Sequence, residues 1–155
     1  MAKEIEKKFT VDTSIWSPQG AGLRVRQGYL PTCGNKTAVR VRITGERAWL
    51  TLKGENTGPV RSEFEYPIPI SDARQILDEL CEQPFIEKTR YLIDYAGETW
   101  EVDVFEQENA GLVIAEIELA SENQKVKLPP WVLDEVTDDP RFYNANLVTR
   151  PFSVW

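Results

Sequence analysis

The chain has 155 residues, of which 41% are hydrophobic and 28% charged, a composition typical of a folded globular domain rather than a disordered segment. It contains no histidine, which excludes a histidine-ligated zinc ion and a Ser-His-Asp triad, so any bound metal must be a hard cation held by carboxylates. The formal net charge of −7 disfavours a nucleic-acid groove or an anionic membrane as the partner.

Two features of the sequence predict a cytoplasmic protein. The stretch 1–6 carries charges where a signal peptide needs an apolar core, and no apolar run is long enough to span a membrane. Cys33 lies in a turn-rich stretch and Cys81 on the apolar stripe of a predicted helix, which favours two reduced thiols over a disulfide.

Polar and apolar residues alternate along most of the chain, with the period of a β-strand. This alternation predicts eight strands, at 3–10, 23–30, 37–45, 48–54, 60–68, 85–95, 98–107 and 112–119. The turns between them are short, which favours antiparallel neighbours. We therefore expect a mainly β (α+β) fold, an eight-stranded antiparallel closed β-barrel or tunnel with helices packed outside.

One helix stands out between the fifth and sixth predicted strands. Ser71 suits its N-cap, an apolar stripe follows, and Pro84 ends it. Beyond the last strand, Pro130 and Pro140 suit the first turns of short helices, and Asp139 could cap the second of these. The sequence shows no repeat, low-complexity segment or linker, so a single domain over 1–155 is expected.

The same strand pattern groups the charged side chains, because alternate residues of a strand share one face. The groups are Glu4 with Glu6 and Lys8, Arg40 with Arg42, Thr51 with Lys53, Arg61 with Glu63 and Glu65, Lys88 with Arg90, Glu101 with Asp103, and Glu116 with Glu118. The opposite faces are apolar and need cover from the helices. We therefore expect the charged faces to line the barrel, whereas for any one strand a solvated face is the alternative.

Basic side chains that converge inside a barrel repel one another. Two like charges ~4 Å apart cost roughly 4 kcal/mol at an effective dielectric constant near 20. A polyphosphate would relieve this repulsion, and Mg²⁺ or Mn²⁺ would let the carboxylate pairs bind the same polyphosphate. The sequence therefore indicates a metal–phosphate site, with internal salt bridges, for example from Arg61 to Glu63 or Glu65, as the alternative.

Ten short blocks of sequence carry a resemblance to a known family. Residues 4–8 read Glu-Ile-Glu-Lys-Lys and fit the pattern E-x-E-x-K. The other blocks follow in order at 27–30, 39–45, 50–54, 61–63, 87–91, 100–105, 115–119, 135–137 and 143–144. Together they resemble the CYTH-domain family, also called triphosphate tunnel metalloenzymes.

This resemblance implies a tunnel that acts on a small triphosphate with the help of Mg²⁺ or Mn²⁺. It implies metal binding by four carboxylates, Glu4, Glu6, Glu116 and Glu118. It implies phosphate binding by six basic residues, Lys8, Arg40, Arg42, Lys53, Arg61 and Arg90. Lys88 would orient or activate the attacking water with Asp103 as its helper, and the C-terminal helix carrying Tyr143 would close one end of the tunnel.

Among the substrates of this family, inorganic triphosphate is the one we expect. The short chain leaves little room for a nucleotide-recognition subdomain, and its acidic balance disfavours RNA. A thiamine triphosphatase, an adenylyl cyclase and a non-catalytic polyphosphate-binding module are the alternatives. The sequence leaves open a homodimer, the number of metal ions, and whether Arg24 and Arg26 line the tunnel mouth or lie on the surface.

Overall fold

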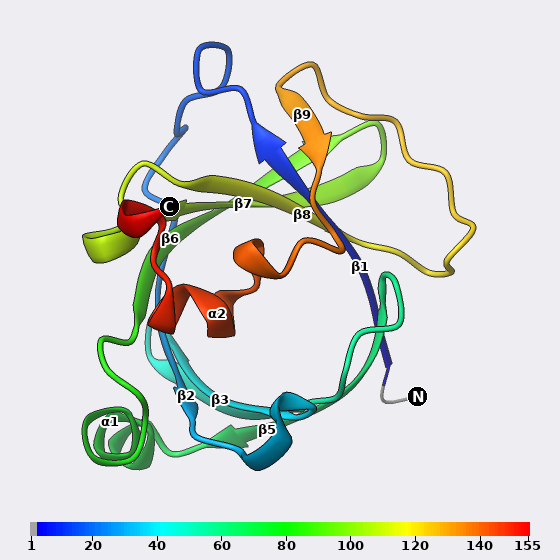
Figure 1. Ribbon diagram of the computed structural model, residues 1–155. Helices are drawn as coiled ribbons and strands as arrows, with labels where there is room; N and C mark the ends of the chain where they lie inside the picture. Colours follow the sequence, from blue (N-terminus) through cyan, green and yellow to red (C-terminus); the bar gives the residue numbers. More distant parts are fainter. Residues whose placement is uncertain (1–2) are drawn as a thin grey trace.

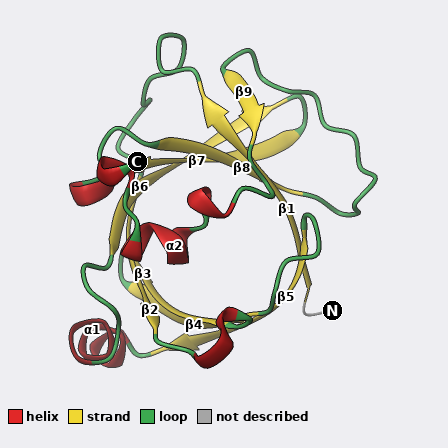
Figure 2. Cartoon of the chain, in the orientation of Figure 1, coloured by secondary structure: helices red, strands yellow, loops and turns green. Residues whose placement is uncertain are grey.

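The computed structural model describes residues 3–155, and within them nine strands form one continuous sheet (Figures 1 and 2). These are β1 (Lys3–Val11), β2 (Leu23–Leu30), β3 (Ala38–Thr44), β4 (Arg47–Lys53), β5 (Val60–Ile68), β6 (Ile86–Tyr95), β7 (Glu98–Phe105), β8 (Val113–Glu118) and β9 (Val132–Glu135). The eight predicted strands are all present, and their ends agree with the prediction to within two residues.

The sheet closes on itself through β1. The strand order is β5-β4-β3-β2-β6-β7-β8-β1-β9, every pairing is antiparallel, and β1 pairs again with β5. One edge of β1 pairs with β8 from Glu6 to Thr10, and the other edge pairs first with β5 and then with β9. The predicted eight-stranded closed barrel is therefore confirmed, with β9 added beside it.

The strand β9 corrects the prediction of a helix after Pro130. Residues 132–135 are extended because β5 occupies β1 only at its beginning, and β9 pairs with the remaining edge of β1 at Phe9 and Val11. The prediction for the next segment is correct, since Asp139 accepts a hydrogen bond from the backbone nitrogen of Arg141 and caps a 3₁₀ turn.

The helix α1 (Ile70–Glu79) packs outside the barrel against β2, β3 and β4 (Figure 1). Its N-cap is Pro69 and not Ser71, which lies inside the first turn and makes no capping hydrogen bond. Ala73 and Leu77 are its buried residues, and they complete an apolar cluster on the outer face of β3 and β4.

The close approach of α1 to β2 depends on Gly28. A Cβ atom at this position would lie 2.9 Å from both Leu77 Cδ2 and Cys81 Cβ. We expect Gly28→Ala to lower the free energy of unfolding by about 1–3 kcal/mol, because an overpacked contact must shift the helix. Urea unfolding measures this loss, and Gly54→Ala is the control, since its Cβ would meet Ser62 at an ordinary 3.5 Å. Equal stability of the two variants would contradict the close contact.

Apolar side chains fill two further regions, one outside the barrel and one at its end. Outside, Trp16, Trp100 and Trp131 pack together over β1, β7 and β8. At one end, the short helix α2 (Asn144–Thr149) lies across the opening (Figure 1). Helix α1 therefore packs outside as expected, whereas α2 lies across an end of the barrel.

Two smaller expectations also have an outcome. Cys33 is exposed, Cys81 is buried, and both are free, as the sequence indicates. Within residues 3–155, no helix is both long and apolar enough to cross a membrane.

Candidate functional site

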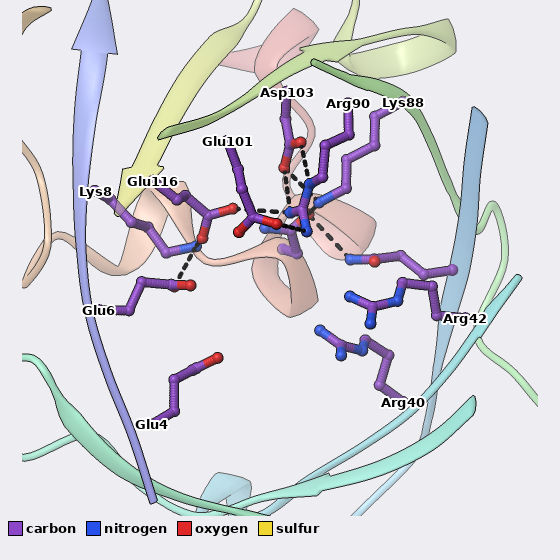
Figure 3. A network of polar contacts seen from close by, with 12 residues as sticks. Glu4, Glu6, Lys8, Arg40, Arg42, Lys88, Arg90, Glu101, Asp103 and Glu116 are labelled. Atoms are coloured by element: carbon purple, nitrogen blue, oxygen red, sulfur yellow. Dashed lines mark hydrogen bonds and ion pairs between the residues drawn. The ribbon is translucent and has the colours of Figure 1, made fainter. Parts of the chain in front are cut away.

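The charged faces of the strands line a cavity of about 980 Å³ inside the barrel. All the predicted site residues except Asp103 line it: Glu4, Glu6, Lys8, Arg40, Arg42, Lys53, Arg61, Lys88, Arg90, Glu116, Glu118 and Tyr143. Figure 3 shows that Glu4 and Glu6 reach into this space from β1, opposite Arg40 and Arg42. The cavity therefore has a carboxylate side and a guanidinium side.

The guanidinium side is crowded with positive charge. Burial, together with the nearby charges of Arg40 and Arg90, lowers the pKa of Arg42 to about 10. Arg40 and Arg42 both contact Glu65, at 3.4 Å, and the buried Nε atoms of both arginines lack a hydrogen-bond partner among the described residues. A buried donor without a hydrogen-bond partner costs free energy. An anion in the cavity that accepts hydrogen bonds from these two guanidinium groups would remove this cost and would therefore bind favourably.

The carboxylate side is formed by β1 and β8, which run antiparallel with Glu6 opposite Glu118 and Lys8 opposite Glu116. Burial and the charges of Glu116 and Glu4 raise the pKa of Glu6 well above its usual range. Although burial opposes it, the charge of Lys8 holds the pKa of Glu116 well below its usual range. Negative charge is therefore in excess around Glu6.

This side fits a hard divalent cation in its chemistry, since its donors are carboxylate oxygens and negative charge is in excess around Glu6. Within residues 3–155 no three such groups converge closely enough to hold an ion as they stand. Lysines occupy two of the carboxylates instead: Lys53 Nζ lies 3.0 Å from Glu4 Oε1, and Lys8 Nζ lies 3.1 Å from Glu116 Oε2. Binding a cation would require these lysines to turn toward another anion.

A buried network joins the two sides. Arg90 donates to both oxygens of Asp103, at 2.7 and 2.9 Å, and also contacts Glu101 and Glu116 at 3.0 and 3.1 Å (Figure 3). Asp103 is fully buried and, unlike the other predicted site residues, does not line the cavity. Its position beneath Arg90 and Lys88 makes it a support for these two side chains rather than a group that touches a ligand.

Among the described residues, Lys88 is the most deeply buried charged residue of the lining. Only 2% of it is exposed, and its Nζ lies 2.7 Å from Asp103 Oδ2 and 3.0 Å from Asn144 Oδ1. Burial lowers the pKa of Lys88 to about 8, an effect that Asp103 opposes and Arg90 reinforces. Lys88 therefore loses its proton at a lower pH than an ordinary lysine does, and the neutral amine is the form that can accept a proton.

The remaining basic residues divide between the cavity and the surface. Arg61 lines the cavity and donates from Nε to the carbonyl oxygen of Gly54, at 3.0 Å, so it does not form the salt bridge to Glu63 or Glu65 that was the example of the alternative. Internal salt bridges do form elsewhere in the lining, as from Lys53 to Glu4. Arg24 is exposed and pairs with Glu87 at 3.1 Å, and neither Arg24 nor Arg26 lines the cavity. The question that the sequence left open is thus answered: both lie outside the tunnel.

Gln27, Tyr29 and Asn144 are among the lining residues that the sequence analysis missed. Gln27 and Tyr29 share the inward face of β2, where the neighbouring Val25 gave the face no charged pattern. Asn144 begins α2 and lies far from the other site residues in sequence. Only the resemblance, whose blocks include 27–30 and 143–144, carried a signal for them.

A closed antiparallel barrel with guanidinium groups facing carboxylates across its interior defines a tunnel protein with a charged lining. Comparison with known proteins specifies this class further. The model of the CYTH domain matches residues 2–143, and the chain belongs to the CYTH family. CYTH triphosphatases are typically metal-dependent.

Several relatives are similar over nearly their whole length. The chain is 51% identical over 152 residues to an inorganic triphosphatase of Acetivibrio thermocellus, covering 98% of this chain and 97% of the relative. It is 38% identical to an inorganic triphosphatase of Nitrosomonas europaea, covering 93% and 95%. A crystal structure of an inorganic triphosphatase superposes with a TM-score of 0.67 at 35% identity, covering 96% of this chain and 95% of that one.

Proposed function

We propose that the protein is an inorganic triphosphatase that hydrolyses a terminal phosphoanhydride bond of inorganic triphosphate with the help of Mg²⁺ or Mn²⁺. The observation that carries the proposal is the cavity lining, which sets the Arg40 and Arg42 pair opposite the carboxylates of β1 and β8. The names of the two near full-length relatives support the same reaction and substrate.

Substrate binding falls to the basic residues of the lining. Arg40, Arg42 and Arg90 offer forked donors to phosphate oxygens, and Lys8, Lys53 and Arg61 add positive charge around them. In the free protein most of these groups rest on carboxylates, so a triphosphate would exchange internal ion pairs for phosphate contacts. Position and charge neutralisation are the main requirements of phosphoryl transfer, and this lining supplies both.

The carboxylates Glu4, Glu6, Glu116 and Glu118 are the residues that would hold the metal ion. A divalent ion bound there supplies a Lewis acid that neutralises charge on the phosphate oxygens. When triphosphate enters, Lys53 and Lys8 gain an alternative anion, which frees Glu4 and Glu116 for this role.

Lys88 is the residue proposed to accept the proton of the attacking water. Its neutral amine takes a proton as the water oxygen bonds to the terminal phosphorus, and the bond from that phosphorus to the bridging oxygen breaks. Pyrophosphate and phosphate are the products. Asp103, which Arg90 holds through an ion pair, supports the amine from beneath, and Tyr143, which lines the cavity next to α2, is proposed to close this end of the tunnel.

The lining favours a substrate without a base or ring. Within residues 3–155, Tyr29 and Tyr143 are the aromatic residues that line the cavity, and the Tyr29 hydroxyl accepts a hydrogen bond from Gln27 at 3.2 Å. Adenine and thiamine bind best between aromatic faces, which two separate tyrosines of this kind do not provide. Inorganic triphosphate needs no such platform.

The test is phosphate release, with Mg²⁺ or Mn²⁺, from inorganic triphosphate, pyrophosphate, ATP and thiamine triphosphate, with the products identified. EDTA-sensitive release from inorganic triphosphate, well above the release from the other three, is the expected result. Formation of cyclic AMP and pyrophosphate from ATP would make the protein a cyclase. Thermal stabilisation by triphosphate without any release would make it a binding module, the alternative in a different class.

A substitution on the guanidinium side tests how the substrate is held. We expect Arg42→Met to raise KM for triphosphate at least tenfold, since a lost charge-assisted hydrogen bond costs roughly 1.5–3 kcal/mol. The melting temperature without ligand should change little, because the substitution also removes repulsion between Arg42 and its neighbours Arg40 and Arg90. Steady-state kinetics measure the change in KM, and a thermal melt measures the change in melting temperature. A large fall in the ligand-free melting temperature would contradict this account of Arg42.

The proposal extends to the chain as a whole. We propose that 1–155 forms one CYTH domain, and that the protein acts in the cytoplasm. Two free cysteines, one of them exposed, support a reducing compartment.

A further inference from the structure

Asn144 lies where α2 meets the Lys88 amine. Its Oδ1 accepts two hydrogen bonds, one from Lys88 Nζ at 3.0 Å and one from Gln27 Nε2 at 3.1 Å. Both partners are almost fully buried, and both lie on strands of the barrel wall, β6 and β2. The first residue of α2 therefore touches the group proposed as the proton acceptor.

The orientation of the Asn144 amide is determined by these two donors. If the amide were turned over, its nitrogen would face two N–H groups and both hydrogen bonds would be lost. Gln27 Nε2 also donates to the Tyr29 hydroxyl at 3.2 Å, while Gln27 Oε1 is buried without a hydrogen-bond partner among the described residues. An oxygen is thus held against Lys88 by a chain of contacts that begins in the wall of the barrel.

A neutral amine has two N–H donors and one lone pair, arranged tetrahedrally. Asp103 Oδ2 and Asn144 Oδ1 lie at hydrogen-bond distance from Lys88 Nζ and can accept both N–H groups. The lone pair must then point in the remaining direction. Lys88 also lines the cavity, which is the space where the attacking water would lie.

We propose that Asn144 is a positioning residue, which together with Asp103 aims the lone pair of Lys88 into the cavity. This inference rests on the proposed function, because it concerns the residue that accepts the proton in that reaction. It also assigns a second task to the C-terminal segment, which completes the catalytic geometry as well as closing the barrel.

The segment is anchored well enough for this task. Phe142, Leu147 and Val148 flank Asn144 and are buried among the apolar side chains at that end of the barrel, including Ile86 and Phe105. Ile86 lies on β6 with Lys88, and Phe105 lies on β7 with Asp103. The apolar contacts that hold the C-terminal segment and the Lys88 amine are therefore on the same two strands.

Three variants separate positioning from folding. Asn144→Ala removes the acceptor, Asn144→Asp keeps an oxygen but adds a charge, and Asn109→Ala is the control. Asn109 is a buried asparagine that accepts a hydrogen bond from the Phe152 backbone at 2.8 Å and so holds the same C-terminal segment without contacting Lys88. Each variant is measured by kcat and KM over a range of pH, by thermal melting, and by ¹⁵N NMR titration of the lysine amines, with Lys88→Met to assign the Lys88 signal.

We expect Asn144→Ala to lower kcat by about tenfold to 100-fold with KM nearly unchanged, because the amine is bound but no longer aimed. The charged groups facing Lys88 are Asp103, Arg90 and Glu116, and a carboxylate at 144 adds one more negative charge. Asn144→Asp should therefore shift both the NMR titration of Lys88 and the rise of kcat to higher pH. Asn109→Ala should lower the melting temperature but shift neither.

The outcomes distinguish this inference from the proposed function. A normal kcat in Asn144→Ala would overturn the positioning role, and so would a rise in KM as large as the fall in kcat. A Lys88 titration that Asn144→Asp leaves in place would overturn the contact itself. If the wild-type protein releases no phosphate while Asn144→Asp still shifts the titration, the proposed function falls and the placement of the amine by Asn144 stands.

Discussion

Replacing Lys88 with alanine is expected to lower kcat for triphosphate by about 100- to 10,000-fold, the range over which a general base contributes. KM should change far less, because Lys88 is proposed to act on the attacking water while the arginines hold the phosphates. The wild-type turnover should rise with pH through about 8, since burial lowers the pKa of Lys88 to about 8 and the neutral amine is the active form. In Lys88→Ala this rise should be lost.

Lys7→Ala provides the matched control for this experiment. Lys7 lies on β1 but does not line the cavity, so its loss should leave kcat and the pH dependence as in the wild type. A rise in KM as large as the fall in kcat in Lys88→Ala would assign Lys88 to substrate binding. A pH dependence that survives in Lys88→Ala would mean that another group accepts the proton.

Asp103→Ala is expected to destabilise the fold by about 3–5 kcal/mol, the cost of removing one partner from a buried ion pair. Asp103 receives two hydrogen bonds from Arg90 and one from Lys88, and no described residue replaces it for Lys88 except the uncharged Asn144. The loss is measured as the free energy of unfolding in urea. Because Asp103 holds the pKa of Lys88 up, its removal should also shift the rise in turnover to lower pH, opposite to Asn144→Asp.

The control for this stability measurement is Asp94→Ala. Asp94 is an exposed residue of β6 that accepts a hydrogen bond from Thr99 at 2.9 Å, and surface substitutions of this kind usually change stability by less than about 0.5 kcal/mol. A loss in Asp103→Ala no greater than in Asp94→Ala would show that the buried network contributes little to the fold.

The strands could be predicted from the sequence because charged and apolar residues alternate without interruption between short turns. For β2 and β5 the predicted ends coincide with the observed ones. The strand β9 could not be predicted in this way, since four residues are too few to show a period, and their conformation depends on a free edge of β1 that only the closed barrel creates. The predicted N-cap of α1 was wrong because the actual N-cap, Pro69, makes no side-chain hydrogen bond and so lacks the sequence signal that Ser71 offered.

The charged lining was predictable because strand parity fixes which side chains point inward. Strand parity does not tell whether an inward-pointing side chain is covered by longer neighbours. It therefore grouped Asp103 with the lining, although Asp103 lies beneath Arg90 and Lys88. Uncharged members such as Gln27 and Asn144 carry no charge pattern, and their importance comes from hydrogen bonds between segments more than 100 residues apart. These contacts are determined by the three-dimensional fold rather than by any local stretch of sequence.

The position of β1 has a consequence for how the molecule is made. It precedes the other eight strands in the chain, yet its partners are residues 60–62, 114–118 and 132–135. During synthesis the barrel therefore cannot close before β8 has left the ribosome, whereas β2 to β5 and α1 pair with near neighbours and can form earlier. Until closure, one sheet exposes both its apolar outer face and its charged inner face, so the nascent chain passes through a stage with unpaired strand edges at which aggregation is the main hazard.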